Sequence, residues 1–183
     1  ISKRGLSIMK LKRVALSILV FILVGSGIAL ASSQWKNSSS LDPMTNEMTW
    51  YAISPYVTST SKMSFPYTGT EAWIGIGKDS KDEWVYIGFT NEPNLVNTKI
   101  GNGYNSVKIR IKWDDELTET TLTQTWGSKF LHFSNDHEII SRISKHNKVL
   151  IELEWYGSGK VYFEFPLSGS AKAIKTMRDA FSK

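Results

Sequence analysis

The sequence contains no cysteine, and this absence excludes several kinds of chemistry. A chain without thiols has no disulfide bonds, no cysteine nucleophile and no cysteine-based zinc or iron–sulfur site. Histidine is scarce as well. His132, His137 and His146 lie in one short stretch, but their spacing matches no helical metal-binding motif such as HExxH. We therefore expect no bound metal and no cofactor.

The chain also lacks a surplus of charge once its first residues are set apart. Its formal net charge is +5, with 22 Lys and Arg against 17 Asp and Glu. Five of the basic residues lie in residues 1–31, which contain no acid, so the other 17 balance the 17 acids. This balance gives no reason to expect a nucleic-acid partner.

Residues 1–31 have the pattern of an export signal. Met9 is the predicted initiator, and residues 1–8 lie upstream of it. The segment then has a basic start at Lys10, Lys12 and Arg13, an apolar run over 14–24, and the small-x-small triplet Ala29-Leu30-Ala31. We expect cleavage before Ser32 and a periplasmic or secreted location. A retained membrane anchor is the alternative, because 14–31 approaches the length of a membrane span.

The remaining 152 residues fit one domain with a sizeable core. Residues 32–47 are polar and are expected to form an N-terminal arm, from which Trp35 packs onto the domain. Residues 48–183 are expected to form a single β-rich domain.

The clearest pattern lies near the C-terminus, where apolar residues alternate over 149–156 and again over 161–167. Because successive strand side chains point to opposite faces, this alternation predicts two half-buried strands. With Gly157-Ser158-Gly159 as the hairpin loop, the predicted facing pairs are Trp155 with Val161, Leu153 with Phe163, Ile151 with Phe165, and Glu152 with Glu164.

A second hairpin is predicted from 107–113 and 118–126, joined by the turn Asp114-Asp115-Glu116-Leu117. The expected pairing places Ile109 opposite Leu122 and Lys112 opposite Glu119. Shorter strands are expected over 50–57, 72–76, 83–90 and 130–133. In 84–89 both faces are apolar, which favours a central strand covered on both sides.

Two short helices complete the predicted elements. One covers about 137–145 after a cap at Asn135 or Asp136 and has Ile139, Ile140 and Ile143 on its apolar side. The other follows Pro166 and Ser168 and carries Ile174, Met177 and Phe181. The fold class is therefore mainly β: an antiparallel sheet or sandwich of about seven or eight strands with two short helices, one of them C-terminal.

Aromatic residues are the most informative feature that is present. All seven tryptophans follow residue 31. Trp113, Trp126 and Trp155 are predicted to lie in the core. Trp73, Trp84 and Tyr86 are expected on an exposed sheet face, with the long loop 91–106 beside them. This face is the predicted binding surface. Such a surface binds a protein partner or, alternatively, a sugar.

The basic residues Lys108 and Arg110 are secondary candidates for binding, because they alternate with Lys112 on the outer side of one strand. A solvated strand face is the ordinary explanation of such a stripe.

No pattern predicts catalysis. No serine lies in a Gly-x-Ser-x-Gly elbow, and Gly75-Ile76-Gly77 precedes a charged turn instead of a helix, which excludes a dinucleotide loop. Asp114, Asp115 and Glu116 share one turn, whereas a glycosidase pair flanks a cleft. We expect no enzyme activity.

One combination of segments carries a family resemblance: Trp35 followed by Asp42-Pro43-Met44-Thr45, the pair Thr125-Trp126, the helix near 139–143, and the run from Phe163 to Ile174. Together these segments resemble the VasI/TagO-like family of small exported proteins, many of them associated with type VI secretion in Gram-negative bacteria. The resemblance implies an accessory role in the envelope without an active site. We expect an envelope or secretion-system protein as the partner. The alternative is a carbohydrate- or peptidoglycan-binding or hydrolase-inhibitor module, and membrane contact is expected only if the leader is uncleaved.

Overall fold

The computed structural model describes residues 34–101 and 103–181, so the predicted export signal lies outside the described residues. The strands are β1 (Lys36–Leu41), β2 (Met48–Ile53), β3 (Val57–Thr58), β4 (Glu71–Lys78), β5 (Glu83–Phe89), β6 (Lys99–Gly101), β7 (Tyr104–Trp113), β8 (Glu116–Thr125), β9 (Phe130–Phe133), β10 (Lys148–Trp155) and β11 (Gly159–Pro166). The helices are α1 (Asp136–Ile143) and α2 (Ser170–Phe181). No helix in the described part of the chain has the length and apolar character needed to cross a membrane.

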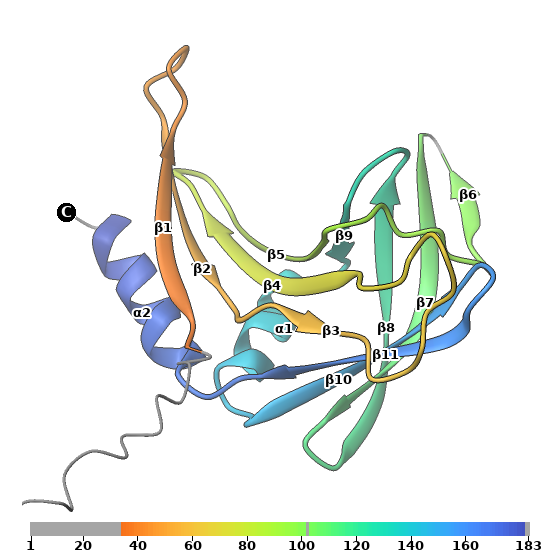
Figure 1. Ribbon diagram of the computed structural model, residues 1–183. Coiled ribbons are helices and arrows are strands. Elements are labelled where there is room, and N and C mark those ends of the chain that lie inside the picture. The colour runs from red at the N-terminus through yellow and green to blue at the C-terminus, as the bar shows by residue number, and fades with distance from the viewer. Residues whose placement is uncertain (1–33, 102, 182–183) are drawn as a thin grey trace, which may run out of the picture. The chain divides into compact units, whose positions relative to one another are not determined.

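All eleven strands belong to one antiparallel sheet (Figure 1). Its strand order is β1-β2-β4-β5-β9-β8-β7-β10-β11, with β3 paired to β4 and β6 paired to β7. The prediction of a mainly β, antiparallel fold with two helices, one of them C-terminal, is confirmed. The strands beyond the predicted seven or eight are short or polar ones such as β1, β3 and β6, which carry no run of alternating apolar residues.

The sheet curves until its last strand meets the chain that follows β3. The amide of Thr60 donates to the carbonyl of Tyr162 in β11 over 2.8 Å. The inner face of this curve holds the core, in which the large rings of Phe89, Phe163 and Trp155 pack together at centroid distances of 5.6–6.5 Å. Helix α1 packs on β5, and α2 packs on β1, β2 and β4 (Figure 1). The outer face of the sheet is therefore the surface on which a binding site can be sought.

Both predicted hairpins form, but each pairs two residues away from the predicted register. In β10 and β11, Leu153 faces Val161 and Ile151 faces Phe163. Glu152 faces Tyr162, so the predicted pairing of Glu152 with Glu164 is wrong. The loop comprises residues 156–158. Gly159, the first residue of β11, pairs with Trp155 and has φ +68°. A shift of two keeps every side chain on its predicted face, because the side-chain period of a strand is two.

The hairpin of β7 and β8 differs in the same way. Val107 faces Leu122 and Arg110 faces Glu119, so the predicted pairs of Ile109 with Leu122 and Lys112 with Glu119 are wrong. The turn contains only Asp114 and Asp115, with Asp114 at φ +47°. Aspartate tolerates this left-handed conformation better than most residues, which permits the tighter turn.

Two segments predicted as irregular contain strands. Within the predicted polar arm 32–47, residues 36–41 form β1 and pair with β2. Trp35 packs onto the domain as expected: it is buried, and its indole N–H donates to the carbonyl of Pro166 over 3.1 Å. The predicted loop 91–106 contains β6 and the start of β7, so the irregular part is shorter than expected.

The predicted helices are present. Asn135 caps α1 by accepting the amide hydrogen of Glu138, and all three predicted isoleucines of this helix are buried. In α2, Ile174 and Met177 are buried. Phe181 is only half-buried, and the Lys78 ammonium lies 4.9 Å from its ring centre.

Candidate functional site

The predicted aromatic residues lie together on the outer face of β4 and β5, where each covers a glycine of the neighbouring strand. Tyr86 lies over Gly75, Trp84 over Gly77, and Trp73 over Gly88. A Cβ built on any of these glycines would lie 2.2–2.5 Å from the nearest ring atom. Glycine is therefore required at these positions, because any side chain would lift the ring that lies against the backbone.

Two further aromatic residues extend this surface on either side. The ring of Tyr56 lies 4.7 Å from that of Trp73, and Phe130 of β9 lies 5.3 Å from Tyr86. Tyr56 is 55% exposed and Phe130 is 40% exposed. We call Tyr56, Trp73, Trp84, Tyr86 and Phe130 the aromatic strip.

The aromatic strip is a partly exposed layer. Strand β5 is central, between β4 and β9, but the prediction that 84–89 is covered on both sides is wrong. On the outer side Trp84 lies against Gly77 and Tyr86 lies against Gly75 and beside Phe130, and both rings are only half-buried. Burial raises the pKa of the Tyr86 hydroxyl above its usual value, so the phenol is neutral at physiological pH. The strip consequently presents rigid, uncharged rings to the solvent.

Lys108 and Arg110 do not join this strip, since β9 and β8 lie between β5 and β7 in the sheet. Both are ion-paired. Lys108 Nζ lies 2.5 Å from Glu119 Oε2. Arg110 forms a two-pronged contact with Glu152, in which Nε donates to Oε1 over 2.9 Å. Lys160 also contacts Glu152, at 3.4 Å.

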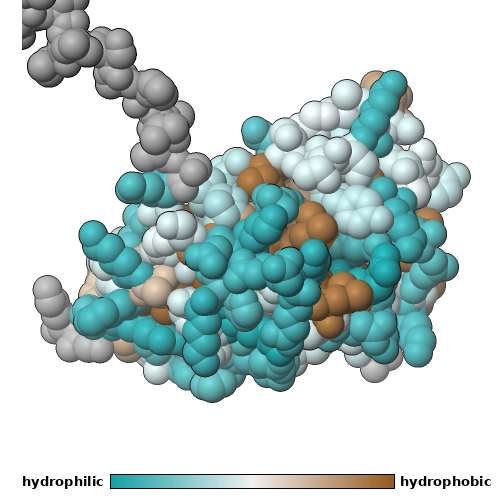
Figure 2. All heavy atoms as spheres, turned by 90° about the horizontal axis from the view of Figure 1, so that it is seen from below, coloured by the Kyte–Doolittle hydropathy of each residue, from teal (hydrophilic) through white to brown (hydrophobic). Residues whose placement is uncertain are grey.

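We call these five residues the charged ladder: Lys108, Arg110, Glu119, Glu152 and Lys160. The hydrogen bonds from Arg110 are the main reason why the pKa of Glu152 falls to about 2. Glu152 is therefore ionised at neutral pH and bound to its neighbours. Figure 2 views the molecule from below the orientation of Figure 1 and shows a largely hydrophilic face with separate apolar patches.

A cleft that the sequence did not predict opens near the end of β8. It has a volume of about 650 Å³ and is lined by Pro66, Tyr67, Asn91, Glu92, Pro93, Asn94, Leu95, Ile100, Asn105, Gln124, Trp126 and Gly127. Trp126 was predicted to lie in the core, and this is wrong: it is 60% exposed. The buried positions predicted for Trp113 and Trp155 are confirmed.

Hydrogen bonds within the described residues hold the lining of this cleft. Gln124 is buried, and its amide nitrogen donates to the carbonyls of Pro93 and Ser128 over 2.9 and 3.0 Å. The indole N–H of Trp126 donates to Asn105 Oδ1 over 3.1 Å. The strand end and both neighbouring loops are thereby fixed to one another. The abundance of asparagine in 91–106 was the signal that could have located this cleft.

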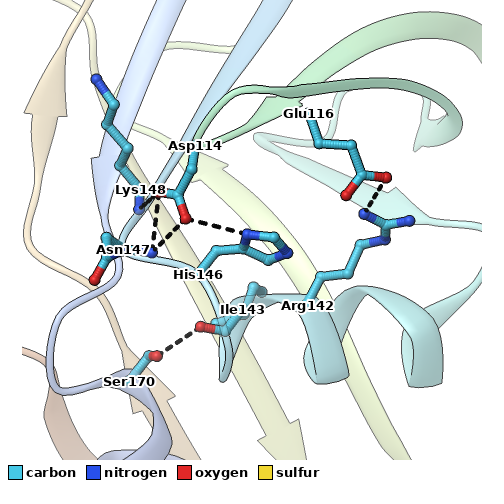
Figure 3. A network of polar contacts seen from close by, with 8 residues as sticks. All are labelled: Asp114, Glu116, Arg142, Ile143, His146, Asn147, Lys148 and Ser170. Carbon is cyan, nitrogen blue, oxygen red and sulfur yellow. Dashed lines mark hydrogen bonds and ion pairs between the residues drawn. The ribbon is translucent and has the colours of Figure 1, made fainter.

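The acidic turn that follows β7 has a structural task (Figure 3). The Asp114 carboxylate accepts hydrogen bonds from the amides of Asn147 and Lys148, at 3.0–3.2 Å, and lies 3.2 Å from His146 Nδ1. Burial raises the pKa of Asp114, but these hydrogen bonds outweigh burial and leave the pKa below its usual value. The turn is thereby fastened to the start of β10.

The same close view shows how α1 is held. Arg142 pairs with Glu116 at 3.0 Å, and the Ser170 hydroxyl donates to the carbonyl of Ile143 over 2.7 Å (Figure 3). Glu116, one of the three carboxylates that the sequence places on this turn, therefore holds α1.

The three histidines lie on different elements: His132 on β9, His137 on α1 and His146 just before β10. Among the residues that the structure describes, no group of three or more His, Cys, Asp or Glu side chains could hold a metal ion.

No protein-family model, curated protein or solved structure matches the chain.

Proposed function

We propose that this chain is an exported, non-enzymatic protein-binding domain of the bacterial envelope, acting as an accessory of a type VI secretion system. The observation that carries the binding role is the aromatic strip, whose rings lie on one sheet face and of which Tyr56 is 55% and Phe130 40% exposed.

The chemistry of the strip suits a protein partner. Tyrosine, tryptophan and phenylalanine are enriched at protein interfaces and supply much of their binding energy. Three of the rings are already held against glycine backbone, so little conformational entropy is lost when a partner covers them. The strip carries no charge, which favours contact with an apolar patch on the partner.

The ion pairs of the charged ladder also support a binding role. Glu152 has the most strongly shifted carboxyl pKa of the described residues, and this carboxylate is already paired with Arg110 and Lys160. Its low pKa is therefore explained by a structural ion pair. The export part of the proposal rests on the leader sequence, and the secretion-system part rests on the family resemblance alone.

The test is recovery of the partner from the envelope fraction of the producing cells by the full chain carrying an affinity tag. We expect Tyr56→Ala and Phe130→Ala to reduce recovery of the partner, and the two together to abolish it. Tyr156→Ala is the matched control, because Tyr156 is 64% exposed and lies in the β10–β11 loop, outside the strip.

Recovery of one envelope or secretion-system protein by the wild type and by Tyr156→Ala, but not by the double variant, would support the proposal. Equal recovery by the double variant, once circular dichroism shows that it is folded, would remove the strip from the binding surface. Recovery of the same protein by an unrelated tagged protein would contradict a specific accessory role.

A further inference from the structure

The cleft near the end of β8 has a lining of unusual chemistry. Four of its twelve lining residues carry side-chain amides, namely Asn91, Asn94, Asn105 and Gln124, and the only one with a formal charge is Glu92. An amide offers two donor hydrogens and a carbonyl acceptor on the same small group. Such a lining is matched to a ligand that has many hydroxyl groups and no charge.

Several of these amide groups are free to meet a ligand. No hydrogen bond among the described residues involves the side-chain amide of Asn94, whose backbone is fixed because its carbonyl accepts the amide of Tyr156 over 2.8 Å. Asn91 donates to the Thr70 hydroxyl over 2.9 Å, which orients the group, and its Oδ1 accepts no hydrogen bond from another described residue. Asn105 Oδ1 accepts from Trp126, and the NH₂ group of Asn105 makes no hydrogen bond within residues 34–101 and 103–181.

Trp126 adds an apolar surface to this polar lining. It is 60% exposed, yet its indole nitrogen is tied to Asn105, so the ring is held in place. The faces of an aromatic ring carry partial negative charge and attract the weakly positive C–H groups of a sugar ring. Ile100, which is 75% exposed, stands in the same lining.

We propose that this cleft, which we name the amide cleft, binds a neutral oligosaccharide. The sugar ring stacks on Trp126, and its hydroxyl groups exchange hydrogen bonds with Asn91, Asn94 and Asn105. A volume of about 650 Å³ suits a small organic ligand. The carboxylate of Glu92 disfavours anionic sugars, and the buried Gln124 keeps the cleft preformed. The site is separate from the aromatic strip and goes beyond the protein-binding function.

The test is titration calorimetry of the full chain with cellohexaose, chitohexaose and the anionic hexamer of galacturonic acid. We expect binding of at least one neutral hexamer and none of the anionic one. Chitohexaose alone would identify an N-acetylated glycan as the source, whereas cellohexaose alone would identify an unsubstituted glucan.

Amino-acid substitutions in the cleft test whether the sugar binds there. Trp126→Ala should weaken it at least about tenfold, the order expected for loss of one aromatic stacking partner. Trp126→Phe keeps a ring and should retain most of the affinity, and Asn94→Ala should weaken it by a smaller factor. Tyr56→Ala is the control and should bind the sugar like the wild type.

Failure of both neutral hexamers to bind at millimolar concentration would overturn the proposal, as would binding of the anionic hexamer alone. Unchanged binding by Trp126→Ala would do so too. Because Tyr56→Ala tests the strip and Trp126→Ala tests the cleft, failure of this inference is distinguishable from failure of the protein-binding function.

Discussion

Two parts of the same outer sheet face present different side chains to the solvent: one part is aromatic and the other is charged. Over β4 and β5 the surface consists of rings lying on glycine backbone, and over β7, β8, β10 and β11 it consists of the charged ladder. In the ladder, each charge has a partner within the domain. In the aromatic strip, each seated ring has one face against the backbone and leaves the rest for a further contact.

This difference indicates which part of the surface would gain more free energy from contact with a partner. Charges that are already paired gain little from a new partner, because a new contact has to replace an existing one. Half-buried aromatic surface still gains when water is removed from it. For this reason we assign the binding role to the strip and not to Lys108 and Arg110.

The largest expected effect concerns the three glycines that lie under rings of the strip, Gly75, Gly77 and Gly88, which we call the glycine seats. Gly88→Ala should destabilise the domain by about 1–3 kcal/mol, the usual cost of overpacking, since the new Cβ would lie 2.3 Å from Trp73 Cζ2. Urea denaturation measures this loss of stability.

A double-mutant cycle separates the ring from other causes of the loss. In a Trp73→Ala background the same Gly88→Ala change should cost almost nothing, because alanine fits a strand better than glycine once the ring is gone. An equal cost in both backgrounds would mean that the glycine is needed for another reason.

A medium effect is expected in the charged ladder. Glu152→Gln should cost about 1 kcal/mol at neutral pH, less than the pKa shift alone implies, because Arg110 is half exposed and solvent screens the pair. The folded-state pKa of about 2 lies below the ordinary value of 4.5. The stabilisation is therefore complete above about pH 5 and disappears as the pH falls from 5 toward 2.

Denaturant titrations of the wild type and Glu152→Gln at several pH values check this. The difference between their free energies of unfolding should shrink on acidification. A difference that stays constant down to pH 2 would show that Glu152 contributes through packing and not through its charge.

The smallest effect is expected for Lys108→Ala. Its pair with Glu119 is exposed at both ends, with side chains 68% and 56% accessible, so the change should alter stability by less than about 0.5 kcal/mol. Recovery of the protein partner should be unaffected. Loss of the partner with this variant would move the binding surface from the strip to the ladder.

The sequence was a good guide to which face each strand residue occupies and a poor guide to register. Alternation over β10 and β11 determines the buried side, and a shift of two residues leaves that side unchanged. The exact pairing depends on how many residues the turn contains. That number followed from left-handed residues such as Asp114 and Gly159, whose conformation is a property of the folded chain.

The candidate sites were predicted to different degrees. Trp73, Trp84 and Tyr86 were correctly expected on one face, because they alternate in sequence with buried residues. The amide cleft was not predicted, since it joins three regions that are separated in the sequence, namely 66–67, 91–105 and 124–127. Trp126 was misassigned because it follows a strand whose alternation ends at Thr125, so its position was set by the turn after the strand.

The glycine seats have a consequence for how this chain can change during evolution. Each of these rings can lie against the backbone only if the residue beneath it is glycine. Once the ring is replaced by a smaller side chain, a Cβ at the glycine position no longer clashes. Positions 75 and 86, 77 and 84, and 73 and 88 should therefore vary as pairs among relatives. A relative with a smaller residue at 73 should tolerate a side chain at 88, and one that keeps tryptophan at 73 should keep glycine there.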